Sequence, residues 1–212
     1  MSLTLKETST AGDYELPPAG THAARCHLVA DLGTVESTYD GKTTASRKLL
    51  IGWTLSELRS DGKPHTIFRR YTASLGQKAA LRAMLESWRA KAFTPEELRA
   101  FDVARLAGVP ALIGVIHVTK DGRSFANIAS VGALPRGLPA PRAQVPEVVF
   151  DLDSPDAWQD IELLPAGVRR QVELSPEWRA VLAKRGAPAA APAAQAGAAG
   201  SGFDDMDSDI PF

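Results

Sequence analysis

The chain has 212 residues, 44% of them hydrophobic and 23% charged, which suffices for one domain with additions or for two small domains. Its single cysteine, Cys26, excludes an internal disulfide, and its four scattered histidines do not form a spaced zinc motif. It contains no apolar run long enough for a transmembrane helix and no apolar signal region at its start, so we expect a cytoplasmic protein.

Charge is distributed unevenly along the chain. Residues 20–136 contain 17 Lys and Arg against 10 Asp and Glu, a net charge of +7. The last ten residues contain four Asp and no basic residue. A basic body followed by an acidic tail predicts a body that binds a polyanion and a tail with a separate function.

The first part of the chain has the residue pattern of strands. Residues 1–19 are polar and contain two consecutive prolines, which predicts an irregular N-terminal arm. Apolar residues then alternate with other residues, most clearly over 49–55, as they do in a strand. Asp-Gly pairs at 40–41 and 61–62 favour turns. The pattern predicts three strands, at 21–33, 47–58 and 66–72, with the second and third paired as a hairpin.

The hydrophobic period then becomes helical. Over residues 77–91 the large apolar side chains recur at spacings of four and three, which places them on one helix face. Thr-Pro-Glu-Glu at 94–97 is typical of a helix start, with Thr as the N-cap. Residues 111–118 and 124–131 are predicted to form two more strands, joined by an Asp-Gly turn at 121–122.

The order of these elements indicates a fold class. Three strands, a helix and two more strands follow one another within residues 20–140, which is the order of an OB-fold, a small barrel used for oligonucleotides. We therefore expect a mainly β protein with helices, built on a five-stranded OB-fold barrel with a helix between strands 3 and 4. Other small barrels also fit this order.

Three segments follow the predicted barrel. Residues 141–186 form an extension with a short helix that Ser175 caps, and this extension either packs on the barrel or mediates dimerisation. Residues 187–202 are almost entirely Ala, Pro, Gly, Gln and Ser, a composition that predicts a disordered linker. Residues 203–212 form an acidic tip.

The acidic tip ends in Asp209-Ile210-Pro211-Phe212 and resembles the tip of bacterial single-stranded DNA-binding proteins, which end in Asp-Asp-Ile-Pro-Phe or a near variant. In that family the tip recruits replication, recombination and repair proteins. The terminal Phe offers a ring to an apolar pocket and a carboxylate to a basic residue, and the aspartates add long-range attraction. Acidic tails often only solvate a protein, but that reading does not predict an apolar end. The expected partner-binding residues are Asp204, Asp205, Asp207, Asp209, Ile210, Pro211 and Phe212.

The body resembles a phage-encoded family of single-stranded DNA-binding proteins. The resemblance rests on Tyr-Thr-Ala-Ser-Leu-Gly-Gln-Lys at 71–78, Leu-Glu-Ser-Trp-Arg at 85–89, Phe-Thr-Pro-Glu-Glu-Leu at 93–98 and Leu-Ala-Gly-Val-Pro at 106–110. The chain departs from the family pattern at Ala73, Gly76, Ala90 and Lys91. The resemblance spans about residues 20–139 and implies a barrel that coats single strands.

Binding of a single strand requires cations for the phosphates and aromatic faces for the bases. Alternation places Phe68 and Arg70 on one face of the third strand, and Arg69 and Tyr71 on the other, and only one face can line a groove. Trp53 alternates with apolar residues, so a place in the core competes with a role in stacking. The candidate nucleic-acid-binding residues are Tyr39, Lys42, Arg47, Lys48, Trp53, Phe68, Arg69, Arg70, Tyr71, Lys120, Arg123 and Phe125, with Lys63 in a neighbouring loop.

No arrangement of residues points to an enzyme. Cys26 and His27 are adjacent on a predicted strand and should point to opposite faces, and no Gly-rich phosphate loop is present. Asp151, Asp153 and Asp156 form an acidic cluster, although such loops are usually only solvated. We therefore expect no catalytic site, no cofactor and no metal.

These observations predict a sequence-tolerant single-stranded DNA-binding protein of a phage or prophage. Its barrel would coat exposed strands, and its tip would recruit host replication, recombination and repair proteins. Two alternatives remain: an interaction module that captures host DNA-maintenance proteins without coating DNA, and a recombination mediator that anneals strands. The oligomeric state is open.

Overall fold

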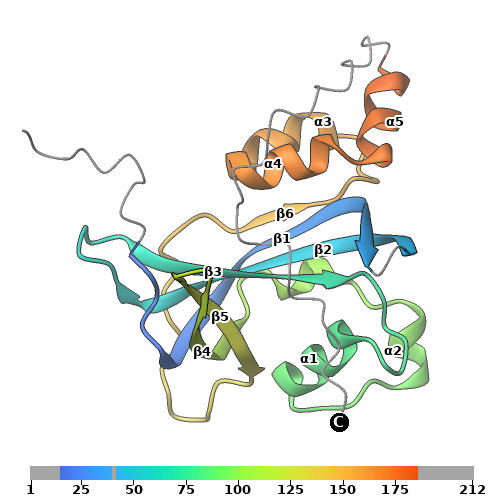
Figure 1. Cartoon of the computed structure of the whole chain (residues 1–212). Coiled ribbons are helices and arrows are strands. Elements are labelled where there is room, and N and C mark those ends of the chain that lie inside the picture. Colours follow the sequence, from blue (N-terminus) through green and yellow to red (C-terminus); the bar gives the residue numbers. More distant parts are fainter. Residues whose placement is uncertain (1–14, 40–41, 186–212) are drawn as a thin grey trace, which may run out of the picture.

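The computed structural model describes residues 15–39 and 42–185 (Figure 1). The predicted linker at 187–202 and the acidic tip at 203–212 lie outside the described residues, as does most of the N-terminal arm. The backbone of Tyr39 is described, but its side chain is not.

A six-stranded sheet forms the centre of the molecule. Five strands follow the order β3-β2-β1-β4-β5 through antiparallel pairs, and β6 lies parallel to the middle of β1. The strands are β1 (Gly20–Tyr39), β2 (Lys42–Leu58), β3 (Pro64–Thr72), β4 (Pro110–Lys120), β5 (Arg123–Gly132) and β6 (Val148–Phe150).

Short helices lie on both sides of this sheet (Figure 1). One group follows β3 and the other follows β6, on the opposite side. The first group comprises α1 (Ala80–Arg89), α2 (Pro95–Arg99) and the 3-10 turn η1 (Val103–Leu106). The second comprises α3 (Ala157–Asp160), η2 (Ile161–Leu163), α4 (Ala166–Glu173) and α5 (Pro176–Lys184).

The predicted fold class, mainly β with helices, is confirmed. The five expected strands and the helix between the third and fourth are present, although β1 and β2 run further than predicted, to Tyr39 and from Lys42. The N-cap predicted at Thr94 is also present, with reciprocal hydrogen bonds between Thr94 and Glu97. Four short elements were missed: β6, α3, η2 and α4.

The hydrogen-bonded sheet is open, rather than closed into the predicted barrel. Its two edge strands, β3 and β5, nevertheless contact each other. The guanidinium of Arg69 spans them, because its Nη1 donates a hydrogen bond to the carbonyl oxygen of Ile128 at 2.9 Å. The sheet is therefore strongly curled, with a side chain where the last ladder of a closed barrel would lie.

The concave side of the curled sheet holds the larger core. Trp53, from β2, is fully buried there against Trp88 of α1, with ring centroids 5.5 Å apart. The indole nitrogen of Trp88 donates to the carbonyl oxygen of Pro110 at 2.8 Å. Leu81, Leu85 and Trp88 all face this core, as their spacing predicts.

A second core, which we name the cap core, lies on the outer side of β1 and β2. Before residue 27 the even-numbered side chains of β1, such as Cys26, point into the first core. A β-bulge between Cys26 and Leu28 reverses this alternation, so that Leu28, Ala30 and Leu32 point to the opposite face. The chain from β6 to α5, which we name the C-terminal cap, packs on them. Its buried residues are Phe150, Leu152, Ala157, Ile161, Leu164, Val172 and Trp178.

The extension that follows the predicted barrel thus packs against the sheet in a single chain. Within this extension Leu163 is 60% exposed and does not belong to the cap core. The N-cap predicted at Ser175 is present, since its hydroxyl accepts a hydrogen bond from the backbone of Trp178 at 3.1 Å.

The described end of the N-terminal arm is fastened to the strands by histidines. His22 Nε2 lies 2.8 Å from the carbonyl oxygen of Pro18, and His117 Nε2 lies 2.7 Å from that of Pro17. The carboxylate of Glu15 accepts hydrogen bonds from Ser60 at 2.8 and 2.6 Å. These contacts tie the arm to β1, to β4 and to the turn between β2 and β3.

Candidate nucleic-acid interface

Two of the predicted stacking residues lie inside the core. Trp53 is 0% exposed and Tyr71 is 3% exposed, so neither presents a ring face to a base, and their prediction as stacking residues is wrong. Burial raises the pKa of Tyr71 to about 12. Both side chains follow the inward alternation of their strands, as Leu49, Ile51 and Leu55 also do.

Four other candidates are engaged by the cap or by neighbouring strands. Phe68 packs against the cap core and meets the edge of His27, with ring centroids 5.5 Å apart. A side chain at Gly52 would place its Cβ 2.5 Å from the Phe68 ring, so the glycine makes this contact possible. Arg70 Nη2 donates to Gln171 Oε1 on α4 at 2.9 Å. Lys48 is 8% exposed and donates to the Thr72 hydroxyl at 2.9 Å.

Arg47, the fourth of these candidates, is bound to carboxylates. Its Nε donates to Asp31 Oδ2 at 2.9 Å, and its Nη2 donates to Asp31 and to Asp153 Oδ2, the latter at 2.9 Å. The hydrogen bonds to Asp31 are the main cause of a raised pKa at Arg47. Arg47, Lys48, Phe68 and Arg70 therefore stabilise the fold in this structure, and their predicted contact with DNA is not supported by their positions.

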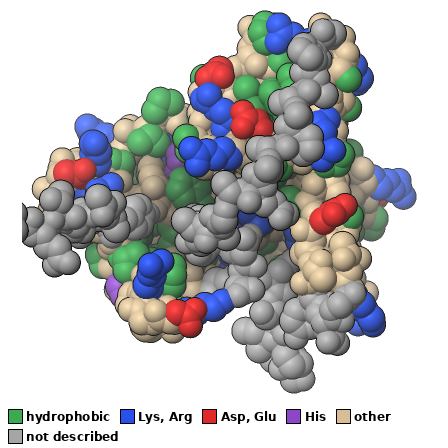
Figure 2. Space-filling view, turned by 45° about the horizontal axis from the view of Figure 1, so that its top comes forward, with side chains coloured by type: hydrophobic (Ala, Val, Ile, Leu, Met, Phe, Trp, Pro, Cys, Tyr) green, Lys and Arg blue, Asp and Glu red, His purple; other side chains and the backbone are tan. Residues whose placement is uncertain are grey.

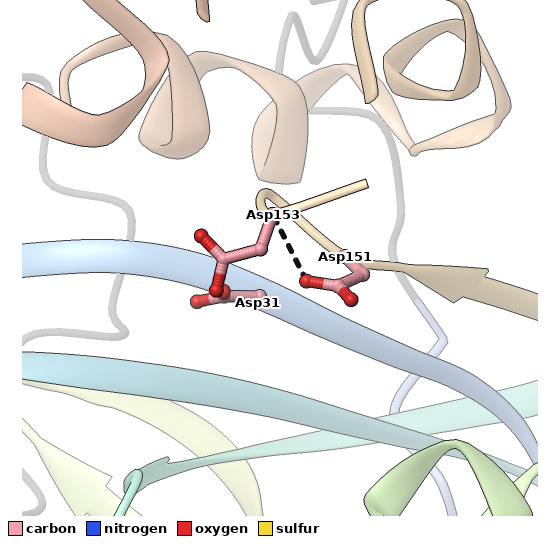
Figure 3. Close-up of side chains that lie close together, drawn as sticks. All are labelled: Asp31, Asp151 and Asp153. Carbon is pink, nitrogen blue, oxygen red and sulfur yellow. Dashed lines mark hydrogen bonds between the residues drawn. The ribbon is translucent and has the colours of Figure 1, made fainter. Parts of the chain in front are cut away.

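Three aspartates meet beside Arg47, and Figure 3 shows their carboxyl groups turned toward one another. Asp31 comes from β1, whereas Asp151 and Asp153 follow β6, and one oxygen of each lies within 4.8 Å of the others. Asp151 Oδ1 accepts a hydrogen bond from the backbone of Asp153 at 2.9 Å, and Asp31 Oδ1 accepts one from Gly33 at 2.9 Å. Arg47 offsets part of this negative charge through its ion pairs with Asp31 and Asp153.

The sequence pattern groups Asp151 and Asp153 with Asp156, whereas in the structure their partner is Asp31. Asp156 instead precedes α3 as its N-cap residue. The available signal was a charged residue inside an apolar strand, because Asp31 stands between Ala30 and Leu32. A side chain in that position needs a partner from elsewhere in the fold.

The far end of the cap is held by a second polar contact. Glu177 accepts hydrogen bonds from the backbone and the hydroxyl of Thr34, at 2.8 and 2.5 Å. Gly33 has a φ of +71°, and a Cβ there would lie 2.6 Å from that of Ser175. Gly33, at a second irregularity within β1, therefore lets α5 approach this strand closely.

The remaining candidates lie at the surface or at the gap in the sheet. Lys42 is exposed at the start of β2, and Lys63 is exposed 4.0 Å from Asp61. Lys120 and Arg123 are exposed at the turn between β4 and β5, and Phe125 is half-buried near them. Arg69 occupies the gap between β3 and β5, and its Cζ lies 5.4 Å from the Tyr71 ring centroid.

The outer side of β4 and β5 therefore groups three of the predicted residues. Val118 pairs with Phe125 and Lys120 pairs with Arg123 across the two strands. Ile116, which the sequence analysis did not single out, is 48% exposed on the same side. On the face in Figure 2, Lys and Arg side chains are more prominent than Asp and Glu, and hydrophobic side chains lie among them.

Cys26 and His27 point to opposite faces, as their adjacency predicts. Burial raises the pKa of Cys26 to about 12 and lowers that of His27 to about 4. The thiol therefore stays protonated and the imidazole stays neutral near pH 7. The two groups do not form a nucleophile and base pair.

Among the described residues, no helix is both long and apolar enough to cross a membrane. A scan against protein-family models found no match to this chain, and a search of curated proteins found none either.

Proposed function

We propose that this protein binds single-stranded DNA without strong sequence preference, through an OB-type barrel. The supporting observation is the connectivity of the curled sheet. Strand β1 pairs with both β2 and β4, helix α1 lies between β3 and β4, and the edge strands β3 and β5 contact each other. Small barrels with this order of strands and helix commonly hold oligonucleotides. The net charge of +7 over residues 20–136 suits a polyanionic ligand.

The acidic tip at 203–212 extends this proposal. Its resemblance to the tip of bacterial single-stranded DNA-binding proteins supports a role in recruiting replication, recombination and repair proteins of a bacterial host. A phage or prophage protein acting in the host cytoplasm would use the tip in this way. The body would protect the strand, and the tip would bring enzymes to it.

One observation favours a second candidate, a protein-interaction module that does not coat DNA. Trp53 and Tyr71 are core residues, and the cap occupies the face that carries Phe68 and Arg70. These four residues are therefore not available to a strand in this structure. An interaction module would retain the tip and need no stacking surface.

Fluorescence anisotropy of labelled oligo-dT distinguishes the two candidates. The full chain and a variant lacking residues 203–212 are compared at low and moderate salt. If the body binds DNA, the affinity of both proteins should decrease as salt increases. The reason is that Lys and Arg side chains that bind phosphates displace counterions from the DNA strand. No binding by either protein, together with host-protein capture that depends on the tip, would favour the interaction module.

A further inference from the structure

The outer surface of the sheet has a covered part and an uncovered part. The cap packs on the outer side of β1 and β2 and reaches β3 through Gln171. Seven apolar side chains of the cap are buried in this contact. Separating the cap from the sheet would expose them to water, which is unfavourable. In Figure 1 the β4–β5 hairpin lies below β1 and β2, whereas the cap helices lie above them.

The hairpin of β4 and β5 presents an outward ladder of its own. The inward residues Ile113, Val115, Ile128 and Val131 belong to the main core. The alternate residues point outward and face one another across the strands. They form the pairs Gly114 with Ser130, Ile116 with Asn127, Val118 with Phe125, and Lys120 with Arg123. We name these eight residues the hairpin platform.

The platform combines the residue types that a single strand requires. Phe125 and Val118 belong to neither buried cluster, and Ile116 is 48% exposed, so apolar surface is offered beside an aromatic ring. Lys120 and Arg123 are exposed at the end of the same ladder. Neither β4 nor β5 contains an Asp or Glu, and Asp121, in the turn that joins them, is the acidic residue nearest to them in the sequence.

The fold also holds the hairpin in a defined shape. Asp121 and Gly122 have φ values of +50° and +73°, the left-handed pair that a tight two-residue turn requires. His117 lies between Ile116 and Val118 on β4, and its Nε2 is 2.7 Å from the carbonyl oxygen of Pro17. The side chain of Pro17 is fully buried. The platform is thus fastened to the body on its inner side, while its outer side carries the basic and apolar residues.

We infer that the hairpin platform is where the strand binds, with phosphates at Lys120 and Arg123 and bases against Phe125 and Ile116. This inference rests on the proposed function and adds the location of the site. Stacking on an aromatic ring is tolerant of sequence, because every base has a π-face. The single strand of DNA contacts the outer ladder of β4 and β5 rather than the covered face of β1, β2 and β3.

The test compares two pairs of substitutions that remove the same charge. One variant carries Lys120→Gln and Arg123→Gln on the platform, and its matched control carries Arg170→Gln and Lys184→Gln on the exposed side of the cap. Oligo-dT anisotropy is measured across a salt series. The platform variant should bind roughly 10- to 30-fold more weakly at about 0.1 M salt, with a salt slope smaller by about 1.4. The control should change by less than about threefold.

A third variant tests stacking alone. Phe125→Ala should weaken oligo-dT binding by roughly 5- to 100-fold and leave the salt slope unchanged, because no charge is removed. Thermal unfolding of each variant confirms that it is folded.

The outcomes separate the location from the function. Weaker binding by the platform variants alone supports the inference. Tight binding by the wild type that the platform substitutions leave unchanged overturns the inference and keeps the proposed function. No binding by the wild type at any salt overturns both.

Discussion

The two outer faces of the sheet carry similar residues and use them differently. The face of β1, β2 and β3 presents Phe68, Arg70 and Arg47, and the cap binds or covers all three. The face of β4 and β5 presents Phe125 and exposed basic residues beyond the reach of the cap core. Residue type therefore identifies candidates for DNA binding, and the cap decides which of them remain accessible.

The comparison also explains the polar contacts under the cap. Asp153, Gln171 and Glu177, which all belong to the cap, each accept a hydrogen bond from a residue of the sheet. A polar group taken from water needs such a partner, because leaving it unpaired destabilises the fold. On the covered face Arg47 and Arg70 thus hold the cap in place, which explains their presence without a bound ligand.

The two faces should differ most in how much stability is lost when a phenylalanine ring is removed. Phe68→Ala should lower the free energy of unfolding by roughly 3–4 kcal/mol, because the ring packs against the cap core and His27. Phe125→Ala should lower it by less than about 1 kcal/mol, since that ring belongs to neither core cluster. Urea unfolding measures both values, and equal losses would break the comparison.

The covered face should also respond to pH through His27. Because burial lowers the pKa of its imidazole from 6.5 to about 4, the unfolded chain binds a proton more readily than the folded protein between these values. Stability is therefore complete above about pH 6.5 and decreases as pH falls toward 4, by at most about 3 kcal/mol. Urea midpoints across this range provide the measurement.

His27→Asn is the control for this pH dependence. The substitution removes the titrating group, so the decrease in stability between pH 6.5 and 4 should become smaller than in the wild type. An unchanged pH profile in the variant would assign the acid sensitivity to other residues.

The smallest expected effect concerns the ion pairs at the edge of the cap. Arg47→Met should cost about 1–2 kcal/mol of unfolding free energy, because it leaves the carboxylate of Asp31, with a side chain 9% exposed, without its main partner. Asp153→Asn, at a side chain that is 72% exposed, should cost less than about 0.5 kcal/mol. Thermal or urea unfolding of the two variants makes the comparison, and a larger loss at Asp153 would contradict it.

Several local features could be predicted because neighbouring residues decide them. The Asp-Gly turn at 121–122, the Thr94 cap and the apolar stripe of α1 all depend on contacts within a few residues. The inward position of Trp53 was also an expected alternative, since it alternates with Leu49, Ile51 and Leu55. The other interpretation, that Trp53 stacks on a base, is inconsistent with its burial.

The features that were missed depend on distant partners. β6 has only three residues and pairs with β1, whose partner residues are more than a hundred positions earlier. Asp31 meets Asp151 and Asp153 only when β6 and the residues after it pack against β1. A three-residue strand or a lone aspartate carries too little periodicity to identify either contact.

By itself the sequence determined the order of the main strands and the helix between β3 and β4, the basic charge of the body and the acidic composition of the tail. These properties follow from local alternation, turn residues and composition. Only the tertiary structure decided that the sheet stays open, that the cap covers the outer face of β1, β2 and β3, and that the cap leaves the outward ladder of β4 and β5 uncovered. Accessibility depends on which distant segment packs on a face, and no local pattern in a strand records that packing.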